Sequence, residues 1–270
     1  MTDFTDKVTL ITGGARGLGL SVAQKMAARG SHVVIWDVAS ESLAGTTAKI
    51  SETGYKVTTY HCDVSDRKMV YTVADRVKKD VGKVDILINN AGVVSGIPLL
   101  ECDDEQIERT MSVNVLAHFW TVKAFLPDMV ETNSGHIVTV ASAGGIVGSS
   151  GLVDYSASKF AAFGFDEALR AELHKERLNI HTTVVCPYFI KGEMFAGVRT
   201  RFSFLLPILD AEDVSERIVN AIVHKKPRVI MPPLVYLTWP LRLLPVAVFD
   251  KVATFLGIND AMDEFQGRRS

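Results

Sequence analysis

A glycine-rich run near the N-terminus, Thr12-Gly-Gly-Ala-Arg-Gly-Leu-Gly19, limits the folds open to this chain more than any other segment. It follows an apolar run, Val8–Thr12, and it leads into Gly17–Arg29, which has a helical pattern of apolar residues. Glycines at such a junction permit a tight turn and let the backbone approach a phosphate closely, and the next helix offers free N–H groups. Between a strand and a helix, the run therefore indicates a dinucleotide-binding unit.

Strand and helix patterns alternate along most of the chain. Runs rich in Val, Ile and Thr predict strands at Val8–Thr12, His32–Asp37, Lys56–His61, Val84–Asn89, His136–Val140 and Ile180–Cys186. Amphipathic segments predict helices at Gly17–Arg29, Ser40–Thr53, Asp66–Val81, Asp103–Glu131, Asp154–Arg177 and Ala211–His224. Several of the strands are apolar throughout, as a sheet covered on both faces requires, so the alternation predicts a parallel sheet between two helical layers.

The composition excludes several classes of protein. With 270 residues, 47% of them hydrophobic, the chain can bury one large core. A net charge of −2 without a basic patch gives no indication of nucleic acid binding. Three widely spaced cysteines and no metal-type histidine spacing predict reduced thiols, a cytoplasmic protein and no metal site. Met1–Lys7 has no apolar run, so neither a signal peptide nor an N-terminal anchor is expected.

Tyr155 and Lys159 are a candidate acid/base pair. They are four residues apart, so on a helix both side chains lie on one face, one turn apart. A free tyrosine titrates near pH ~10, and a nearby ammonium favours the phenolate. We therefore expect Lys159 to lower the pKa of Tyr155. The spacing alone is weak evidence, because many solvated helices share it.

An acidic residue ends the second predicted strand and bears on the choice of cofactor. Asp37 stands eighteen residues after Gly19, where a carboxylate can accept hydrogen bonds from ribose hydroxyls and would repel a 2′-phosphate. Arg16 is an opposing signal, because its guanidinium could pair with that phosphate. No basic residue follows Asp37, so NAD is favoured over NADP.

In these features the chain resembles the short-chain dehydrogenase/reductase family over residues 6–195. The glycine-rich run matches the family's TGxxxGxG cofactor loop, and Asn89-Asn90-Ala91-Gly92 matches its NNAG segment. Asn114 matches a helix asparagine, Ser142 precedes Tyr155 by thirteen residues, and Asp63 resembles an adenine-contacting acid. The resemblance implies one Rossmann-type doubly wound α/β domain, residues 1–270, with a seven-stranded parallel sheet and helices on both faces.

The resemblance also implies roles for individual residues. Tyr155 would exchange a proton with an alcohol or carbonyl, Lys159 would assist it and bind the nicotinamide ribose, Ser142 would hold the substrate oxygen, and Asn114 would bind a relay water. The implied cofactor contacts are Gly13, Ala15, Arg16, Gly17, Leu18, Gly19, Asp37, Asp63, Val64, Asn90, Ala91, Gly92, Tyr155, Lys159, Pro187 and Ile190.

The chain departs from the family pattern after the sixth predicted strand. Tyr188 replaces the usual glycine after Pro187, and Gly192 occupies the site of a threonine that contacts the nicotinamide amide. We expect backbone near Ile190 to take over that contact. The family pairs subunits through helices that correspond to Asp103–Glu131 and Asp154–Arg177, which predicts a homodimer or homotetramer.

Two later segments bear on the substrate. Residues 188–210 are expected to form a mobile substrate loop, with Phe195, Phe202, Phe204, Leu205 and Leu206 in a hydrophobic pocket. Residues 227–270 form an apolar C-terminal region, with an amphipathic helix predicted at Pro245–Leu256. This region could complete the core or a subunit contact, form a wall of the pocket, or attach weakly to a membrane or lipid surface. Its end resembles the retinol and 17β-hydroxysteroid dehydrogenase branch.

The sequence therefore predicts an NAD-dependent oxidoreductase that interconverts an alcohol and a carbonyl on a hydrophobic substrate, such as a steroid, a retinoid, or an aromatic or aliphatic alcohol. One alternative is an NADP-dependent carbonyl reductase. Alternatives from another class are a nucleotide-sensing protein and a lipid-surface protein with little activity. An epimerase or dehydratase on the same fold is disfavoured, because those relatives carry a TGxxGxxG loop.

Overall fold

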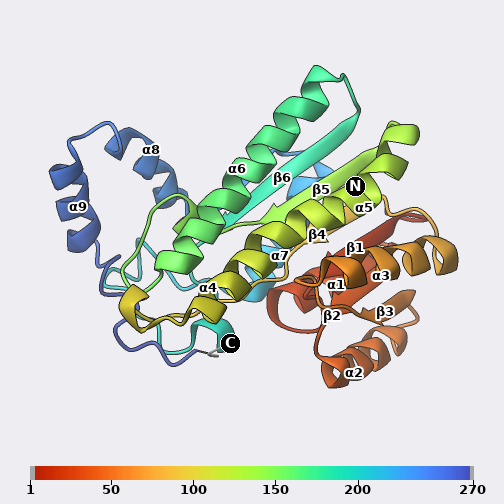
Figure 1. Ribbon diagram of the computed structural model, residues 1–270, viewed down its shortest axis with the longest axis horizontal. Helices are drawn as coiled ribbons and strands as arrows, with labels where there is room; N and C mark the ends of the chain where they lie inside the picture. Colours follow the sequence, from red (N-terminus) through yellow and green to blue (C-terminus); the bar gives the residue numbers. More distant parts are fainter. Residues whose placement is uncertain (1–3, 268–270) are drawn as a thin grey trace.

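Seven parallel strands form one sheet in the order β3-β2-β1-β4-β5-β6-β7 (Figure 1). The computed structural model describes residues 4–267. The strands are β1 Val8–Thr12, β2 His32–Asp37, β3 Val57–His61, β4 Ile86–Asn89, β5 Gly135–Val140, β6 Ile180–Pro187 and β7 Arg228–Met231. The predicted seven-stranded parallel sheet is thus confirmed. The strand order reverses between β1 and β4, and open sheets of this kind bind ligands at the carboxyl end of that switch point.

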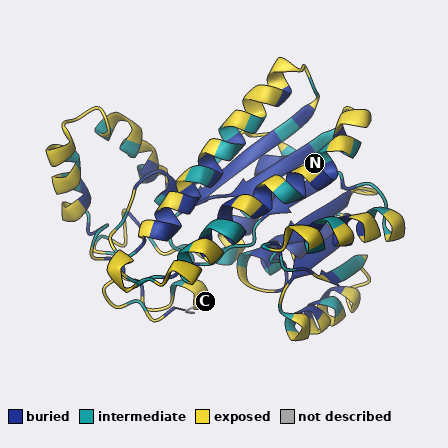
Figure 2. Cartoon of the chain, in the orientation of Figure 1, coloured by how far each residue is buried: buried dark blue, intermediate teal, exposed yellow. Residues whose placement is uncertain are grey.

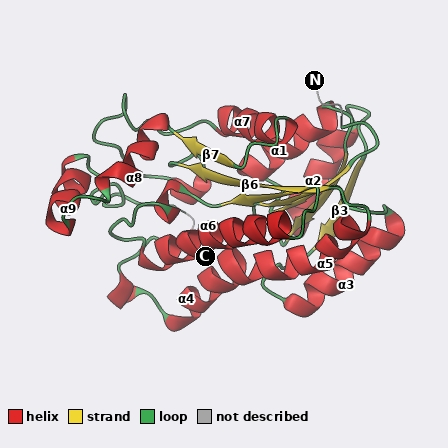
Figure 3. Cartoon of the chain, turned by 90° about the horizontal axis from the view of Figure 1, so that it is seen from above, coloured by secondary structure: helices red, strands yellow, loops and turns green. Residues whose placement is uncertain are grey.

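Helices cover both faces of the sheet (Figure 3). On one face, α1 Gly17–Ala28, α2 Ser40–Ser51 and α7 Ala211–Val223 bury apolar side chains against β1, β2 and β4. On the other face, α3 Arg67–Asp80, α5 Ala117–Glu131 and α6 Val153–Lys175 do the same. The sheet between them is almost wholly buried (Figure 2), which explains why β1 is apolar or Thr at every position.

The segment predicted as one helix over Asp103–Glu131 is interrupted. It consists of α4 Asp104–Met111, a π-helical turn at Ser112–Leu116, and α5. Asp103 and Gln106 begin α4 with a reciprocal capping box. A π turn holds one more residue than an α turn, and such turns are frequent at functional sites. Here the turn contains Asn114, one of the candidate site residues.

The chain after β6 is mostly irregular and ends in a projecting arm. Residues 188–210 contain only the short helix η4 Glu193–Phe195 and a bridge between Ile190 and Leu209. After β7 come η5 Pro233–Leu237, α8 Thr238–Leu241 and α9 Val246–Phe255, the last of which confirms the predicted amphipathic helix. Figures 1 and 3 both place α8 and α9 at one end of the molecule, beyond the sheet.

The ends of the chain limit two of the predictions. Residues 1–3 and 268–270, which belong to the predicted domain and to the apolar C-terminal region, lie outside the described residues. Within residues 4–267, every helix is either too short or too polar to cross a bilayer.

Candidate active site

The loop between β1 and α1 forms an open cradle at the carboxyl end of the sheet. Gly13 has φ +63, and a side chain on Gly19 would lie 2.2 Å from the carbonyl oxygen of Gly13, so both positions require glycine. Arg16 begins α1 without a side-chain cap, and the first turn of α1 has no acidic residue. The N–H groups at the start of α1 are therefore available to an anion.

Asn90 and Thr12 hold this loop against the end of β4. The Asn90 side-chain amide donates to the carbonyl oxygens of Thr12 and Gly13, both at 3.0 Å. The Thr12 hydroxyl accepts from the backbone N–H groups of Asn90 and Ala91, at 3.0 and 3.1 Å. Asn90 therefore fixes the shape of the cradle through its side chain. Thr12 has the same function, which the sequence reasoning missed although Thr12 directly precedes the glycines.

Asp37 connects the cradle to the ends of β2 and β3. Its carboxylate is 6% exposed and accepts from the backbone N–H groups of Ala15 and Ala39, at 3.1 and 3.0 Å. Asp63 accepts from both the N–H and the hydroxyl of Ser65, at 2.9 and 2.6 Å, and Val64 beside it is buried. Each Asp37 oxygen carries a further lone pair, so ribose hydroxyls can still be bound.

The π-helical turn aims Asn114 at the loop that follows β4. Asn114 is fully buried; its carbonyl oxygen accepts from the N–H of Val93 at 2.9 Å, and its amide donates to the carbonyl of Val93 at 2.9 Å. The same amide donates to the hydroxyl of Ser158 at 3.0 Å, which connects the turn to α6. A side chain on Gly92 would lie 3.4 Å from the Asn114 oxygen and 3.5 Å from the Lys159 ammonium. Asn114, Gly92 and Lys159 therefore converge.

The first turns of α6 and the end of β5 bring together the three remaining catalytic candidates. Tyr155 and Lys159 are 5% and 3% exposed, and the Lys159 ammonium lies 5.7 Å from the centre of the Tyr155 ring. Lys159 donates to the carbonyl oxygen of Val140 at 2.9 Å. The Ser142 hydroxyl accepts from the N–H of Gly144 at 3.0 Å and donates to the carbonyl of Pro187 at 3.4 Å.

Burial dominates the protonation of the pair. It raises the pKa of Tyr155 to about 12, although the neighbouring Ser142 hydroxyl acts in the opposite direction. It lowers the pKa of Lys159 to about 8. The expectation that Lys159 lowers the pKa of Tyr155 is wrong in this structure, because desolvation of the phenolate dominates and the opposing influence comes from the Ser142 hydroxyl, not from the ammonium.

The backbone around Ile190 pairs with the far end of the loop over residues 188–210. The N–H of Leu209 donates to the carbonyl oxygen of Phe189, and the N–H of Lys191 donates to the carbonyl oxygen of Leu209, both at 2.8 Å. These bonds do not use the amide groups of Ile190, so its backbone remains available for the contact predicted for it. Pro187 ends β6 beside Met231 of β7.

A cavity of about 270 Å³ opens beside Tyr155 and Ser142. Phe195, Leu205 and Leu206 line it, as the sequence predicted. Phe202 and Phe204 do not; Phe202 stacks on Phe255, and Phe204 is 80% exposed. The C-terminal region also lines the cavity, which was one of the alternatives predicted for it, through Leu234, Val235, Leu237, Thr238, Leu241, Val252, Leu256 and Ile258. Sequence reasoning missed the lining residues that follow β5 and β6: Ala143, Gly144, Val147, Leu152, Tyr188 and Phe189.

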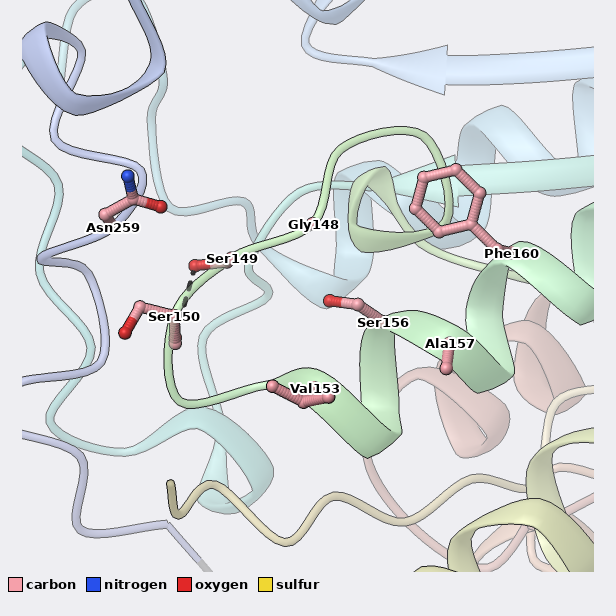
Figure 4. Close-up of a pocket in the computed structure, with 8 residues that line it drawn as sticks. All are labelled: Gly148, Ser149, Ser150, Val153, Ser156, Ala157, Phe160 and Asn259. Carbon is pink, nitrogen blue, oxygen red and sulfur yellow. Dashed lines mark hydrogen bonds between the residues drawn. The ribbon is translucent and has the colours of Figure 1, made fainter. Parts of the chain in front are cut away.

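A second, more open hollow shares only Ser149 with this cavity (Figure 4). It encloses about 690 Å³, and Gly148, Ser150, Val153, Ser156, Ala157, Phe160 and Asn259 complete its lining. The Ser156 hydroxyl points toward the Gly148–Ser149 backbone in Figure 4. Neither Tyr155, Ser142 nor Lys159 lines this hollow, so its larger volume does not make it the reaction site.

The functional candidates contain no metal-binding arrangement. Within residues 4–267, His, Cys, Asp and Glu form no group of three or more that could hold a metal ion. The hydroxyl groups of Ser142 and Tyr155 and the ammonium of Lys159 can support acid/base chemistry, and the uncapped start of α1 nearby can accept an anion.

Comparison with known proteins agrees with this arrangement. The family model "short chain dehydrogenase" matches residues 7–202. The bovine short-chain dehydrogenase/reductase family 16C member 6 is 46% identical over 266 residues, which cover 97% of this chain and 84% of the relative. Human epidermal retinol dehydrogenase 2 is 46% identical over 262 residues, which cover 96% of this chain and 85% of the relative.

A solved structure extends the comparison to the fold. A short-chain dehydrogenase/reductase from Burkholderia phymatum, determined in complex with NAD, superposes with a TM-score of 0.82 at 28% identity and covers 96% of this chain and 98% of its own. The chain thus belongs to the short-chain dehydrogenases, a family of oxidoreductases. Within that family, it lies in the branch that contains the retinol dehydrogenases.

Proposed function

We propose that this protein transfers hydride between NAD(H) and the alcohol or carbonyl group of a lipophilic substrate, with retinol-like primary alcohols as the first candidates. The observation that carries the proposal is the cavity beside Tyr155. Its lining is mainly apolar, and the hydroxyls of Ser142 and Tyr155 lie in it together. A mainly apolar pocket with a few convergent polar groups is the usual form of a small-molecule site.

The cradle fits a dinucleotide. The uncapped start of α1 suits a pyrophosphate, and a side chain on Gly17 would meet only open space, so a ligand has room above the loop. Gly92 lies next to Lys159 and Asn114. The loop after β4, which contains Gly92, therefore connects the cradle to the acid/base pair of Tyr155 and Lys159. When bound, the nicotinamide supplies the hydride acceptor or donor. Gly13–Gly19, Asp37, Asp63 and the backbone near Ile190 would hold the cofactor.

Tyr155 is proposed to handle the proton. With its pKa raised to about 12, the phenol is protonated at neutral pH, so it can donate to a carbonyl oxygen in the reductive direction. In the oxidative direction the phenolate must form first, which nearby positive charge favours. Lys159, held by Val140, would supply that charge.

Ser142 and Asn114 are proposed to complete the site. The Ser142 hydroxyl lies in the cavity and can hydrogen-bond the substrate oxygen, whose charge changes during the reaction. Asn114 fixes the loop after β4 next to Lys159 and would place a relay water there. The role of Asn114 requires the π-helical turn, because this turn aims Asn114 at Val93.

The names of the relatives support the substrate class. Human epidermal retinol dehydrogenase 2 shares 46% identity over nearly the whole chain, and rat retinol dehydrogenase 10 shares 42% over 292 residues. The apolar cavity suits a long hydrocarbon with one hydroxyl, which would lie between the residue 188–206 segment and the arm. Asp37 supports NAD over NADP, because its buried carboxylate would repel a 2′-phosphate.

The test is a cofactor-by-substrate screen. NADH formation would be followed with retinol, a steroid alcohol, an aromatic alcohol and an aliphatic alcohol, and each reaction would be repeated with NADP. We expect the highest kcat/KM with NAD and retinol. A preference for NADP would reverse the weighting of Asp37 against Arg16. Tight NAD binding without turnover of any alcohol would instead support a nucleotide-sensing protein.

Self-association is a further part of the proposal. The faces of α5 and α6 carry half-exposed apolar side chains, among them Phe119, Val130 and Phe160. These support pairing of two chains through the two helices, as expected for the family. Light scattering during size-exclusion chromatography would measure the mass, and a monomer at micromolar concentration would contradict this part.

A further inference from the structure

The turn between α8 and α9 exposes four consecutive apolar residues, Leu243-Leu244-Pro245-Val246, at the end of the projecting arm. Leu243 is 87% exposed and Val246 is 75% exposed. In Figure 2 most of the arm has the yellow colour of exposed residues. Contiguous exposed apolar surface of this kind marks an interaction site.

The apolar surface continues from the arm toward the cavity. Phe255 on α9 is 63% exposed and stacks on Phe202, whose ring in turn lies 6.3 Å from that of Phe204. The other side of the same arm lines the cavity through Leu241, Val252 and Leu256. One short segment therefore carries the wall of the proposed substrate site and an outward apolar surface.

Arginines hold the arm in place. The Arg242 guanidinium lies 5.3 Å from the Phe160 ring and 5.7 Å from the Phe249 ring, and it donates to the carbonyl of Ile146 at 2.5 Å. The Arg228 guanidinium lies 5.0 Å from the Phe163 ring and 5.5 Å from the Trp239 ring, and it pairs with Glu167 at 2.6 Å. The exposed apolar turn is therefore presented on a fixed base, as a docking element requires.

We propose that the α8–α9 turn is a lipid-contact element that inserts its apolar tip into a membrane surface, from which lipophilic substrate reaches the cavity. The substrate route rests on the proposed function, whereas lipid binding does not. Trp239 and Tyr236 flank the tip and are 40% and 43% exposed, and such aromatic side chains favour the membrane–water interface. Lys251 on α9 and Arg201, whose guanidinium lies 5.8 Å from the Phe255 ring, place positive charge beside this apolar surface, with Asp250 as the neighbouring acid, which favours anionic lipid.

The shape of the surface argues for lipid over a second copy of the chain. A stable protein interface buries about 800 Å² on each partner and needs a complementary surface. The tip is a four-residue turn at the end of an arm, which is convex and small, and the proposed pairing surface lies on α5 and α6 instead. An apolar turn with flanking aromatics and cations suits shallow, reversible insertion.

The experiment is vesicle flotation of the full chain, with phosphatidylcholine vesicles and with vesicles that also contain phosphatidylserine. The test variant is Leu243→Ser with Val246→Ser; neither residue lines the cavity. Leu100→Ser is the matched control, because Leu100 is a fully exposed leucine on η1 Leu99–Glu101, outside the arm. We expect wild type and Leu100→Ser to float, more strongly with phosphatidylserine, and the double variant to bind roughly tenfold less.

Turnover provides a second readout. The double variant should oxidise a short water-soluble alcohol like wild type but lose activity toward retinol supplied in vesicles. If no alcohol is turned over while flotation still depends on the tip, the lipid-contact element stands and the proposed function fails. Equal flotation of wild type and the double variant, or no flotation of wild type, would overturn the inference. So would a loss of oligomer mass in the double variant, which would assign the tip to a second copy.

Discussion

Lys159 donates its hydrogen bond to the backbone carbonyl of Val140, at 2.9 Å, across the gap between α6 and the end of β5. The acceptor belongs to the strand that leads directly to Ser142. The ammonium is therefore held by the same strand end that positions the Ser142 hydroxyl. This bond, rather than a contact with the phenol of Tyr155, defines the position of the Lys159 ammonium.

Replacement of Tyr155 by phenylalanine should remove the proton donor and leave the ring in place. We expect kcat to fall by at least ~10²-fold, because general acid-base catalysis contributes about that much. NAD affinity, measured by fluorescence quenching, should stay close to that of wild type. The matched control is Tyr188→Phe: Tyr188 lines the same cavity, and burial likewise raises its pKa to about 12. Activity above a few per cent in Tyr155→Phe would refute the assignment.

The lowered pKa of Lys159 should appear in the pH profile of carbonyl reduction. The ammonium is present below its pKa of about 8 and is lost as the pH rises through that value. We therefore expect kcat/KM, which reports the free enzyme, to decline above about pH 8. In Lys159→Gln the decline near pH 8 should be absent and the rate at pH 7 lower. An unchanged profile in that variant would show that another group titrates.

Gly19→Ala should damage the cofactor cradle. The added methyl would lie 2.2 Å from the Gly13 carbonyl oxygen and 2.6 Å from the Asn90 amide nitrogen, so the loop must move. Overpacking of this kind costs about 1–3 kcal/mol, and a loss of that size in the binding free energy would lower NAD affinity roughly 5- to 150-fold. Gly164→Ala on α6 is the control, since its methyl meets open space and should stabilise the helix by ~0.5–1 kcal/mol. Calorimetric titration with NAD would measure the affinity of both variants, and only Gly19→Ala should show the loss.

Asp166 should make stability depend on pH. Burial raises the pKa of this carboxyl on α6 to about 7, with Thr182 as a hydrogen-bond donor at 3.3 Å. The folded chain then keeps a proton that the unfolded chain releases, so the contribution to stability is full below about pH 4 and is lost as the pH rises through 7. Asp166→Asn has no such proton to lose. Its free energy of unfolding relative to that of wild type, measured with urea, should therefore increase between pH 5 and pH 8.

The matched control for this prediction is Asp75→Asn. It removes an exposed carboxylate from α3. The stability difference between this variant and wild type should change little between the two pH values. If Asp166→Asn stabilised the protein more at pH 5 than at pH 8, relative to wild type, the raised pKa of the Asp166 carboxyl would be contradicted.

Much of the fold follows from local sequence. The bounds of β1 and β2 agree with the predicted runs, because short runs dominated by apolar and β-branched residues leave few alternatives in a covered sheet. The interruption of the Asp103–Glu131 helix did not follow, because no residue in Ser112–Leu116 signals a π turn. That turn accompanies hydrogen bonds between Asn114 and Val93, which only the tertiary arrangement brings together.

The site divides in the same way. The cradle and the Tyr155–Lys159 pair lie on regular elements with fixed spacing, so their proximity could be predicted. The pocket wall could be predicted only in part: the apolar C-terminal region was one candidate for it, but the side chains that enter the cavity depend on how irregular segments fold back. Phe204 therefore lies in solvent, whereas Tyr188 and Val252 line the cavity. The pKa direction of Tyr155 was wrong because the spacing indicates a neighbour but not the depth of burial.

The π-helical turn at Ser112–Leu116 is, in effect, one surplus residue stored inside a helix. A chain that loses one residue there could close the helix into a regular α form, which is the more ordinary structure. We expect such a deletion to keep the melting temperature near that of wild type and to abolish turnover, since Asn114 would no longer meet Val93. At this position, chain length rather than side-chain chemistry would separate a folded protein from a working enzyme.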